Sequence, residues 1–145
     1  MNKREKAIRL MEEIRNNRPR PLLENLDKGE RGINFILGYL LNHREEVIAA
    51  DLAKELGAST ARISVLLKKM KDRELIETAS SKEDARKIVI RLAGKGERLA
   101  KDNFEKLVRA HEKLLDNLND DEIETFLKIS GKIKLIMDET MKEGG

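Results

Sequence analysis

The spacing of apolar residues predicts a chain made mainly of α-helices. In six segments they recur three and four positions apart, which places them on one side of a helix. These segments are residues 3–17, 29–42, 50–56, 59–71, 94–117 and 119–141. Pro19 and Pro21 end the first segment because proline does not continue a helix, and residues 22–26 are expected to add a short helical turn.

Between the fourth and fifth helices the pattern changes to a period of two, which is typical of a half-buried strand. Ile88, Ile90 and Leu92 alternate with Lys87, Val89 and Arg91. Residues 75–79 are the expected partner strand, and the polar stretch SSKEDAR between them is the expected turn. Asp84 is expected to accept hydrogen bonds from the loop backbone and to pair with Arg86, while residues 47–48 are expected to form a short strand beside the hairpin.

The helix at residues 59–71 has a distinct beginning and two different faces. Gly57 suits the left-handed position that ends the preceding helix, and Ser59 is a suitable N-cap. The inward face carries Ile63, Leu66, Leu67 and Met70. The opposite face carries Ala61, Ser64, Val65 and Lys68, flanked by Arg62 and Lys69. Small residues backed by cations suit close approach to DNA base edges and phosphates.

A helix-turn-helix followed by a hairpin can place one helix in a major groove and a basic loop beside it. An arginine on a stiff loop is also suited to a minor groove. The candidate DNA-binding residues are Lys54, Ser59, Thr60, Ala61, Arg62, Ser64, Val65, Lys68, Lys69, Lys82, Asp84, Arg86 and Lys87. The alternatives are an ordinary surface helix with a solvated basic face and a solvated hairpin loop without specific contacts.

These features resemble the MarR-type (multiple antibiotic resistance regulator) winged helix-turn-helix transcription factors over residues 33–118. The resemblance is carried by the stretches LAKELGAS, RISVLLKKMKDRELIE, DAR at 84–86 and RLAGKGERL. Val65 departs from the family, because many members have a basic residue there. Ala93 also departs from it, because it replaces the usual Thr and removes a helix N-cap.

The fold class implied is mainly α with a small β-hairpin wing and terminal dimerisation helices. Within one MarR-like domain of residues 1–145, we expect a DNA-binding lobe at 29–92 and a helical dimerisation lobe at 1–17 and 94–142. The resemblance also implies a repressor whose small-molecule effector binds between the two lobes, near residues 19–26, Tyr39, His43 and the start of the long helix.

The apolar stripes of the terminal helices also predict a homodimer, independently of the family resemblance. These helices carry more apolar surface than one small lobe can cover, and a stripe without a partner in its own chain suggests a second chain. We therefore expect a two-fold dimer built on residues 1–17 and 100–142, and a nearly palindromic operator. The alternative is a helical bundle closed within one monomer.

Charge is concentrated where DNA binding is predicted. The whole chain has a net charge of only +3, although 39% of its residues are charged. Residues 58–92 hold nine lysines and arginines against five acids, so the local excess is four positive charges. The chain has no cysteine, which excludes disulfides and thiolate sites. Its longest apolar stretch, residues 35–41, is too short to cross a membrane, so we expect a cytoplasmic protein.

No enzyme motif emerges from the remaining residues. His43 and His111 lack the spacing of metal ligands, and Gly94–Lys95–Gly96 does not match a phosphate-binding loop. Ser64 and Ser80 have no histidine nearby in sequence. We therefore expect no catalysis, cofactor or metal. The competing function is a winged-helix adaptor that binds protein, an alternative prompted by Val65 and the modest net charge.

Overall fold

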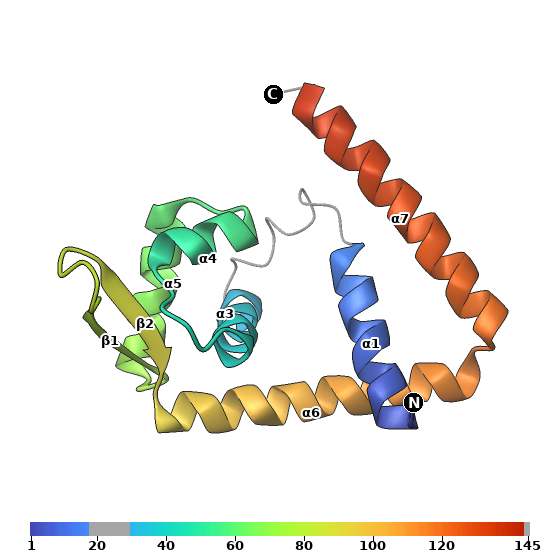
Figure 1. The fold of residues 1–145 in the computed structure, drawn as a ribbon, viewed down its shortest axis with the longest axis horizontal. Helices are drawn as coiled ribbons and strands as arrows, with labels where there is room; N and C mark the ends of the chain where they lie inside the picture. The colour runs from blue at the N-terminus through green and yellow to red at the C-terminus, as the bar shows by residue number, and fades with distance from the viewer. Residues whose placement is uncertain (18–29, 144–145) are drawn as a thin grey trace. The chain divides into compact units, whose positions relative to one another are not determined.

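The computed structural model describes residues 1–17 and 30–143 and is mainly helical, with one antiparallel hairpin (Figure 1). The elements are α1 (Lys3–Asn16), α3 (Glu30–Asn42), α4 (Ala49–Leu56), α5 (Thr60–Asp72), β1 (Ile76–Ser80), β2 (Ile88–Leu92), α6 (Gly94–Asn117) and α7 (Asp120–Glu143). This confirms the predicted mainly α fold with a small β-hairpin. The helical turn expected at residues 22–26 lies outside the described residues.

The chain forms two compact units, and α6 contributes to both. The first unit comprises Met1–Leu23 and Phe104–Gly145, and the second unit comprises Glu24–Asn103. The winged helix-turn-helix therefore includes the first ten residues of α6 in addition to the hairpin. The domain limits predicted above, 29–92 for one lobe and 1–17 with 94–142 for the other, stay a prediction.

The core of the second unit is formed where α3, α4, α5 and the hairpin meet. Its fully buried side chains are Ile33, Ile36, Leu37, Leu52, Leu56, Ile63, Met70 and Val47, with Leu66 and Ile90 almost completely covered. Apart from Val47 and Ile90, these are the positions at helical spacing on the inward faces of the helices, so hydrophobic burial fixes which side of α5 faces outward.

The turns on both sides of α5 are set by backbone conformation and capping. Gly57 is left-handed, with φ of 68°, and the Ser59 hydroxyl accepts a hydrogen bond from the Arg62 backbone N at 3.2 Å, as predicted. At the other end Glu74 is left-handed, with φ of 60°. The Glu74 N donates to the Lys71 carbonyl and the Leu75 N donates to the Met70 carbonyl. This pattern is a Schellman ending, formed here without a glycine.

Strict alternation along β2 was wrong. Val89 and Ile90 are both buried, whereas Ile88 is about half exposed. The Ile90 N donates to the Val47 carbonyl at 2.8 Å, so residue 47 adds a third strand-like segment beside β2 and covers its middle. Ile88 pairs with Ser80 at the distal end of the hairpin, which leaves its side chain open. The partner strand is residues 76–80 instead of 75–79.

The start of α6 lies directly against the end of α5. The Ala93 N donates to the Leu75 carbonyl at 3.0 Å. A Cβ atom added to Gly96 would lie 1.9 Å from the same oxygen, which no side chain can occupy. Gly96 is therefore required by a close backbone approach. Gly38, within α3, has no atom within 4 Å of an added Cβ.

In the first unit α1 packs on α6 through a small core of Ala7, Met11 and Val108. The Arg4 guanidinium donates to both oxygens of Glu105, at 2.6 and 2.8 Å. Asn17 Nδ2 donates to the Leu127 carbonyl of α7 at 3.1 Å. Large apolar residues of α7 are nevertheless exposed, namely Phe126, Ile129, Ile133, Leu135, Ile136 and Met141.

We predict that Gly96→Ala lowers the free energy of unfolding by at least about 2 kcal/mol, because the new methyl group must displace the Leu75 backbone. Gly38→Ala is the matched control. It should raise stability by about 0.5–1 kcal/mol, since a helical glycine is replaced in open space. Urea unfolding followed by circular dichroism measures both. A Gly96→Ala protein as stable as the wild type would contradict the close approach described above.

Candidate nucleic-acid interface

The outward face of α5 presents the predicted residues to solvent. The exposed positions on this helix include Thr60, Ala61, Arg62, Ser64, Val65, Lys68 and Lys69, while Ile63, Leu66 and Met70 are buried. Lys54 of α4 is also exposed. The helix is 13 residues long and begins at a capped turn, so its first residues are held in a defined position.

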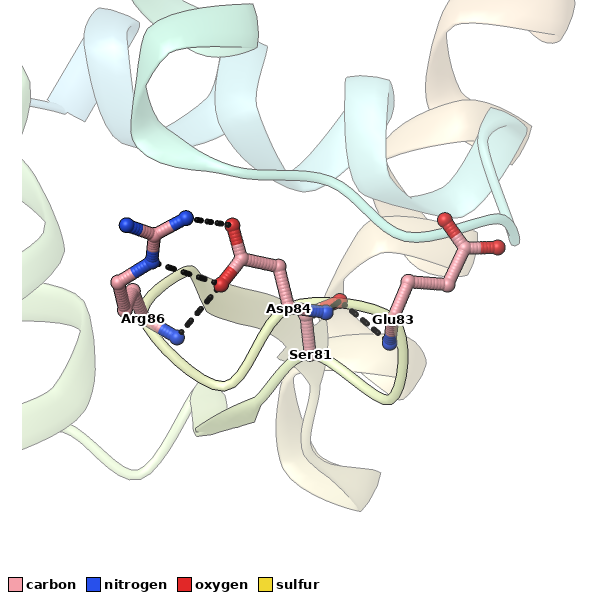
Figure 2. A network of polar contacts seen from close by, with 4 residues as sticks. All are labelled: Ser81, Glu83, Asp84 and Arg86. Carbon is pink, nitrogen blue, oxygen red and sulfur yellow. Dashed lines mark hydrogen bonds and ion pairs between the residues drawn. The ribbon is translucent and has the colours of Figure 1, made fainter.

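The loop between the strands, residues 81–87, is stiffened by a local pair that the sequence predicted (Figure 2). An Asp84 carboxylate oxygen accepts hydrogen bonds from the Arg86 backbone N at 3.0 Å and from its Nε at 3.2 Å. These bonds lower the pKa of Asp84, the backbone bond first and the side-chain bond second. The Arg86 side chain is 91% exposed, so its guanidinium projects from an ordered loop.

A second set of contacts anchors this loop, and it was not predicted. Ser81 is only 7% exposed, and its hydroxyl accepts hydrogen bonds from the backbone N atoms of Glu83 and Asp84 (Figure 2). The same hydroxyl donates to Glu46 Oε2 at 2.7 Å, and the Lys82 backbone N donates to Glu46 Oε1 at 3.1 Å. The pKa of Glu46 is lowered, first by the Ser81 bond and then by the Lys82 bond.

The sequence offered a signal for the role of Ser81 in this anchor but none for the role of Glu46. A serine at the start of a polar loop is typical of a local turn in which the hydroxyl accepts backbone hydrogen bonds, so Ser81 could have been found. Glu46 lies 35 residues earlier in the chain, and nothing local connects it with the loop. Its role depends on the tertiary pairing of residue 47 with β2.

The basic residues of residues 58–92 differ in their intramolecular contacts. Lys71 Nζ donates to Thr78 Oγ1 at 3.4 Å, and Arg73 forms a 2.7 Å ion pair with Glu30. Neither was among the candidate DNA-binding residues. The candidates Lys82, Arg86 and Lys87 are all exposed on the loop, and Lys68 and Lys69 are exposed on α5. One group of exposed cations therefore lies on α5 and the other on the loop that connects the strands of the hairpin.

The two histidines make local helix contacts. His43 stacks on Tyr39 with ring centroids 3.9 Å apart, and its Nδ1 lies 2.8 Å from the Tyr39 carbonyl oxygen. His111 Nδ1 lies 2.7 Å from the Leu107 carbonyl oxygen. Within residues 1–17 and 30–143 no group of three or more His, Cys, Asp or Glu is placed to hold a metal ion. Over the same described part of the chain, no helix is long and apolar enough to span a membrane.

Comparison with known proteins finds a family model that matches part of the chain. The sequence matches the MarR family model over residues 35–87, from α3 through the loop of the hairpin. No curated protein matches the chain. The apo form of a Lactococcus lactis ZitR variant is 26% identical with a TM-score of 0.56, and the match covers 78% of this chain and 84% of that one.

Two structures of Staphylococcus aureus MepR share the fold. The MepR–DNA complex is 24% identical with a TM-score of 0.63, covering 78% of this chain and 82% of that chain. MepR described as a transcription regulator of the multidrug efflux pump MepA is 22% identical with a TM-score of 0.59, covering 85% and 88%. The match of residues 35–87 to the MarR family model and the fold shared with these structures agree with the resemblance seen in the sequence.

Proposed function

We propose that the protein is a homodimeric, sequence-specific regulator of double-stranded DNA, acting as a repressor in the cytoplasm. The observation that carries the proposal is the exposed face of α5, which combines small residues with cations and belongs to the same unit as a stiffened basic loop. The MepR–DNA complex, which shares this fold, supports the same use of the fold here. Repression follows if the bound dimer blocks access to the duplex.

In this proposal α5 enters the major groove. A helix of 13 residues is about 20 Å long, and its diameter of about 10–12 Å with side chains fits a groove about 12 Å wide. The exposed residues of its first two turns, between Thr60 and Val65, then approach base edges, and Lys68 and Lys69 reach phosphates. Lys54 on α4 adds a further phosphate contact.

The loop of residues 81–87 is proposed to bind the minor groove or the adjacent backbone. The Asp84 carboxylate orients Arg86 without covering its guanidinium, which is the arrangement that insertion into a groove requires. Lys82 and Lys87 flank it and would neutralise phosphates. Contacts of this kind position the protein and contribute affinity on any sequence.

The dimer is proposed to form through the first unit. The exposed apolar residues of α7 form a run too large for a surface that faces only water. A second copy of the chain would cover this run and present two α5 helices about one helical turn of DNA apart. The operator would then be a near-palindrome. The family resemblance supports a small-molecule effector, which would act by changing the DNA affinity of the dimer.

DNA recognition is tested with duplexes selected from a random pool. Arg62→Ala should weaken binding to the selected duplex by about 1–3 kcal/mol, because its side chain is proposed to contact a base. Arg86→Ala should weaken binding to selected and random duplexes alike. The affinity of this variant should also depend less on salt concentration, because one phosphate contact is lost. Arg98→Ala, an exposed arginine of α6 outside the proposed surface, is the control. Wild-type affinity in both test variants would contradict the model, and an adaptor protein would not shift random duplex even at low salt.

If the dimer forms through α7, placing charges on this helix should lower the mass of the particle in solution. The wild-type chain of 16.6 kDa should sediment at twice that mass at micromolar concentration. Combining Ile133→Glu with Ile136→Glu should reduce it to the monomer mass, since carboxylates cannot be buried there without a partner. Ile88→Glu makes the same change on the hairpin and should leave the dimer intact. A double variant that remains dimeric would place the interface elsewhere.

The loop anchor predicts a pH-dependent effect. Ser81→Ala removes the largest cause of the lowered pKa of Glu46, so that pKa should rise toward its ordinary value. Because the folded-state pKa lies below the unfolded one, the ionised carboxylate stabilises the fold at neutral pH, and this contribution is lost as the pH falls through the folded-state pKa. An NMR titration of the side-chain carboxyl groups measures the pKa of Glu46 in both proteins. Glu105, whose pKa is lowered by Arg4, should not change.

The same Ser81→Ala variant should bind random duplex more weakly, since a loosened loop no longer holds Arg86 in place. An unchanged pKa of Glu46 would show that the Ser81–Glu46 bond is not formed in solution.

A further inference from the structure

The centre of the exposed face of α5 is apolar, which is unusual in a surface surrounded by cations. Val65 is 56% exposed, and among the described residues it is the one large apolar side chain that α5 leaves open. It belongs to no part of the core, which uses Ile63, Leu66 and Met70 on the opposite side. Val65 therefore contributes nothing to the core of the unit, and its side chain is available to a partner from outside it.

Ala61 extends this apolar centre by one turn. At about 100° per residue, positions 61 and 65 lie within about 40° of each other around the helix axis, so their methyl groups follow one line. Lys68 continues that line toward the C-terminal end, and Ser64 lies beside it. The apolar pair therefore lies in the N-terminal half of α5, which is the part of a recognition helix that contacts base edges.

We propose that Ala61 and Val65 recognise the C5-methyl groups of thymines in the operator. This inference rests on the proposed function and specifies what its base recognition uses. In the major groove, thymine alone presents a methyl group, whereas the other bases present hydrogen-bond donors and acceptors at their edges. A valine placed over a guanine or cytosine edge would desolvate polar atoms without pairing them, which is unfavourable.

The surrounding charges support a DNA base as the occupant, in preference to an apolar protein surface. Lys68 and Lys69 follow within one turn, Arg62 lies on the flank, and all three are exposed. An apolar partner surface would have to desolvate these cations, whereas a duplex pairs them with phosphates while its thymine methyl group meets the valine. The half-site is therefore expected to contain thymine under the first two turns of α5.

The test removes the methyl group without changing base pairing. A duplex selected with the wild-type protein is resynthesised with deoxyuridine replacing one thymine at a time, and the affinity of each duplex is measured. We expect at least one position in each half-site where the loss weakens wild-type binding about fourfold, the value of burying one methyl group. Val65→Ser should bind the thymine and uracil duplexes equally at that position.

Ile88→Ser is the matched control, because it removes an equally exposed apolar residue from the hairpin and should keep the fourfold discrimination. If no uracil position weakens binding, methyl recognition by α5 is overturned although DNA binding stands. If the discrimination persists at every such position in Val65→Ser, recognition by Val65 is overturned. If no duplex is selected from the pool at all, the proposed function fails instead.

Discussion

The backbone of Leu75 is the point on which the second unit depends. Its N donates to the Met70 carbonyl and ends α5, and its carbonyl accepts a hydrogen bond from the Ala93 N at the start of α6. The same carbonyl lies where the Cβ of residue 96 would be. One residue thus joins α5, the base of the hairpin and α6. Any shift here would move the loop of residues 81–87 relative to α5, because the hairpin begins at the next residue.

Two anchors of different kinds then hold that loop. Asp84 and Arg86 form a pair within the loop, which stiffens its tip. Glu46 ties the loop through Ser81 to the segment beside β2, where Val47 pairs with Ile90. The first anchor orients a guanidinium, and the second fixes the place from which it projects. Both use carboxylates that are ionised at neutral pH, so the basic loop is positioned by acidic residues.

Local pattern predicted the parts of this unit that local physics determines. Helical spacing identified the inward face of α5, and Gly57, Ser59 and the Asp84–Arg86 pair follow from turn and capping chemistry over a few residues. What could not be predicted depends on distant segments. Val47 covers β2 and disrupts its alternation, and Glu46 reaches Ser81 across 35 residues. Glu74 adopts a left-handed conformation that its side chain disfavours, because the end of α5 and the start of the hairpin require it.

Exposed apolar side chains occur in both units, and their surroundings indicate different partners. On α7 Phe126, Ile129, Ile133 and Ile136 follow one another at helical spacing, so a contiguous strip is available to a second apolar surface. On α5 Val65 has one small apolar neighbour and several cations around it. Burying a contiguous apolar strip is favourable in proportion to the area that it removes from water. An isolated valine among cations suits a partner that offers one methyl group surrounded by negative charges, as a thymine between phosphates does. That distinction is the basis for proposing a second protein chain for the first surface and a duplex for the second.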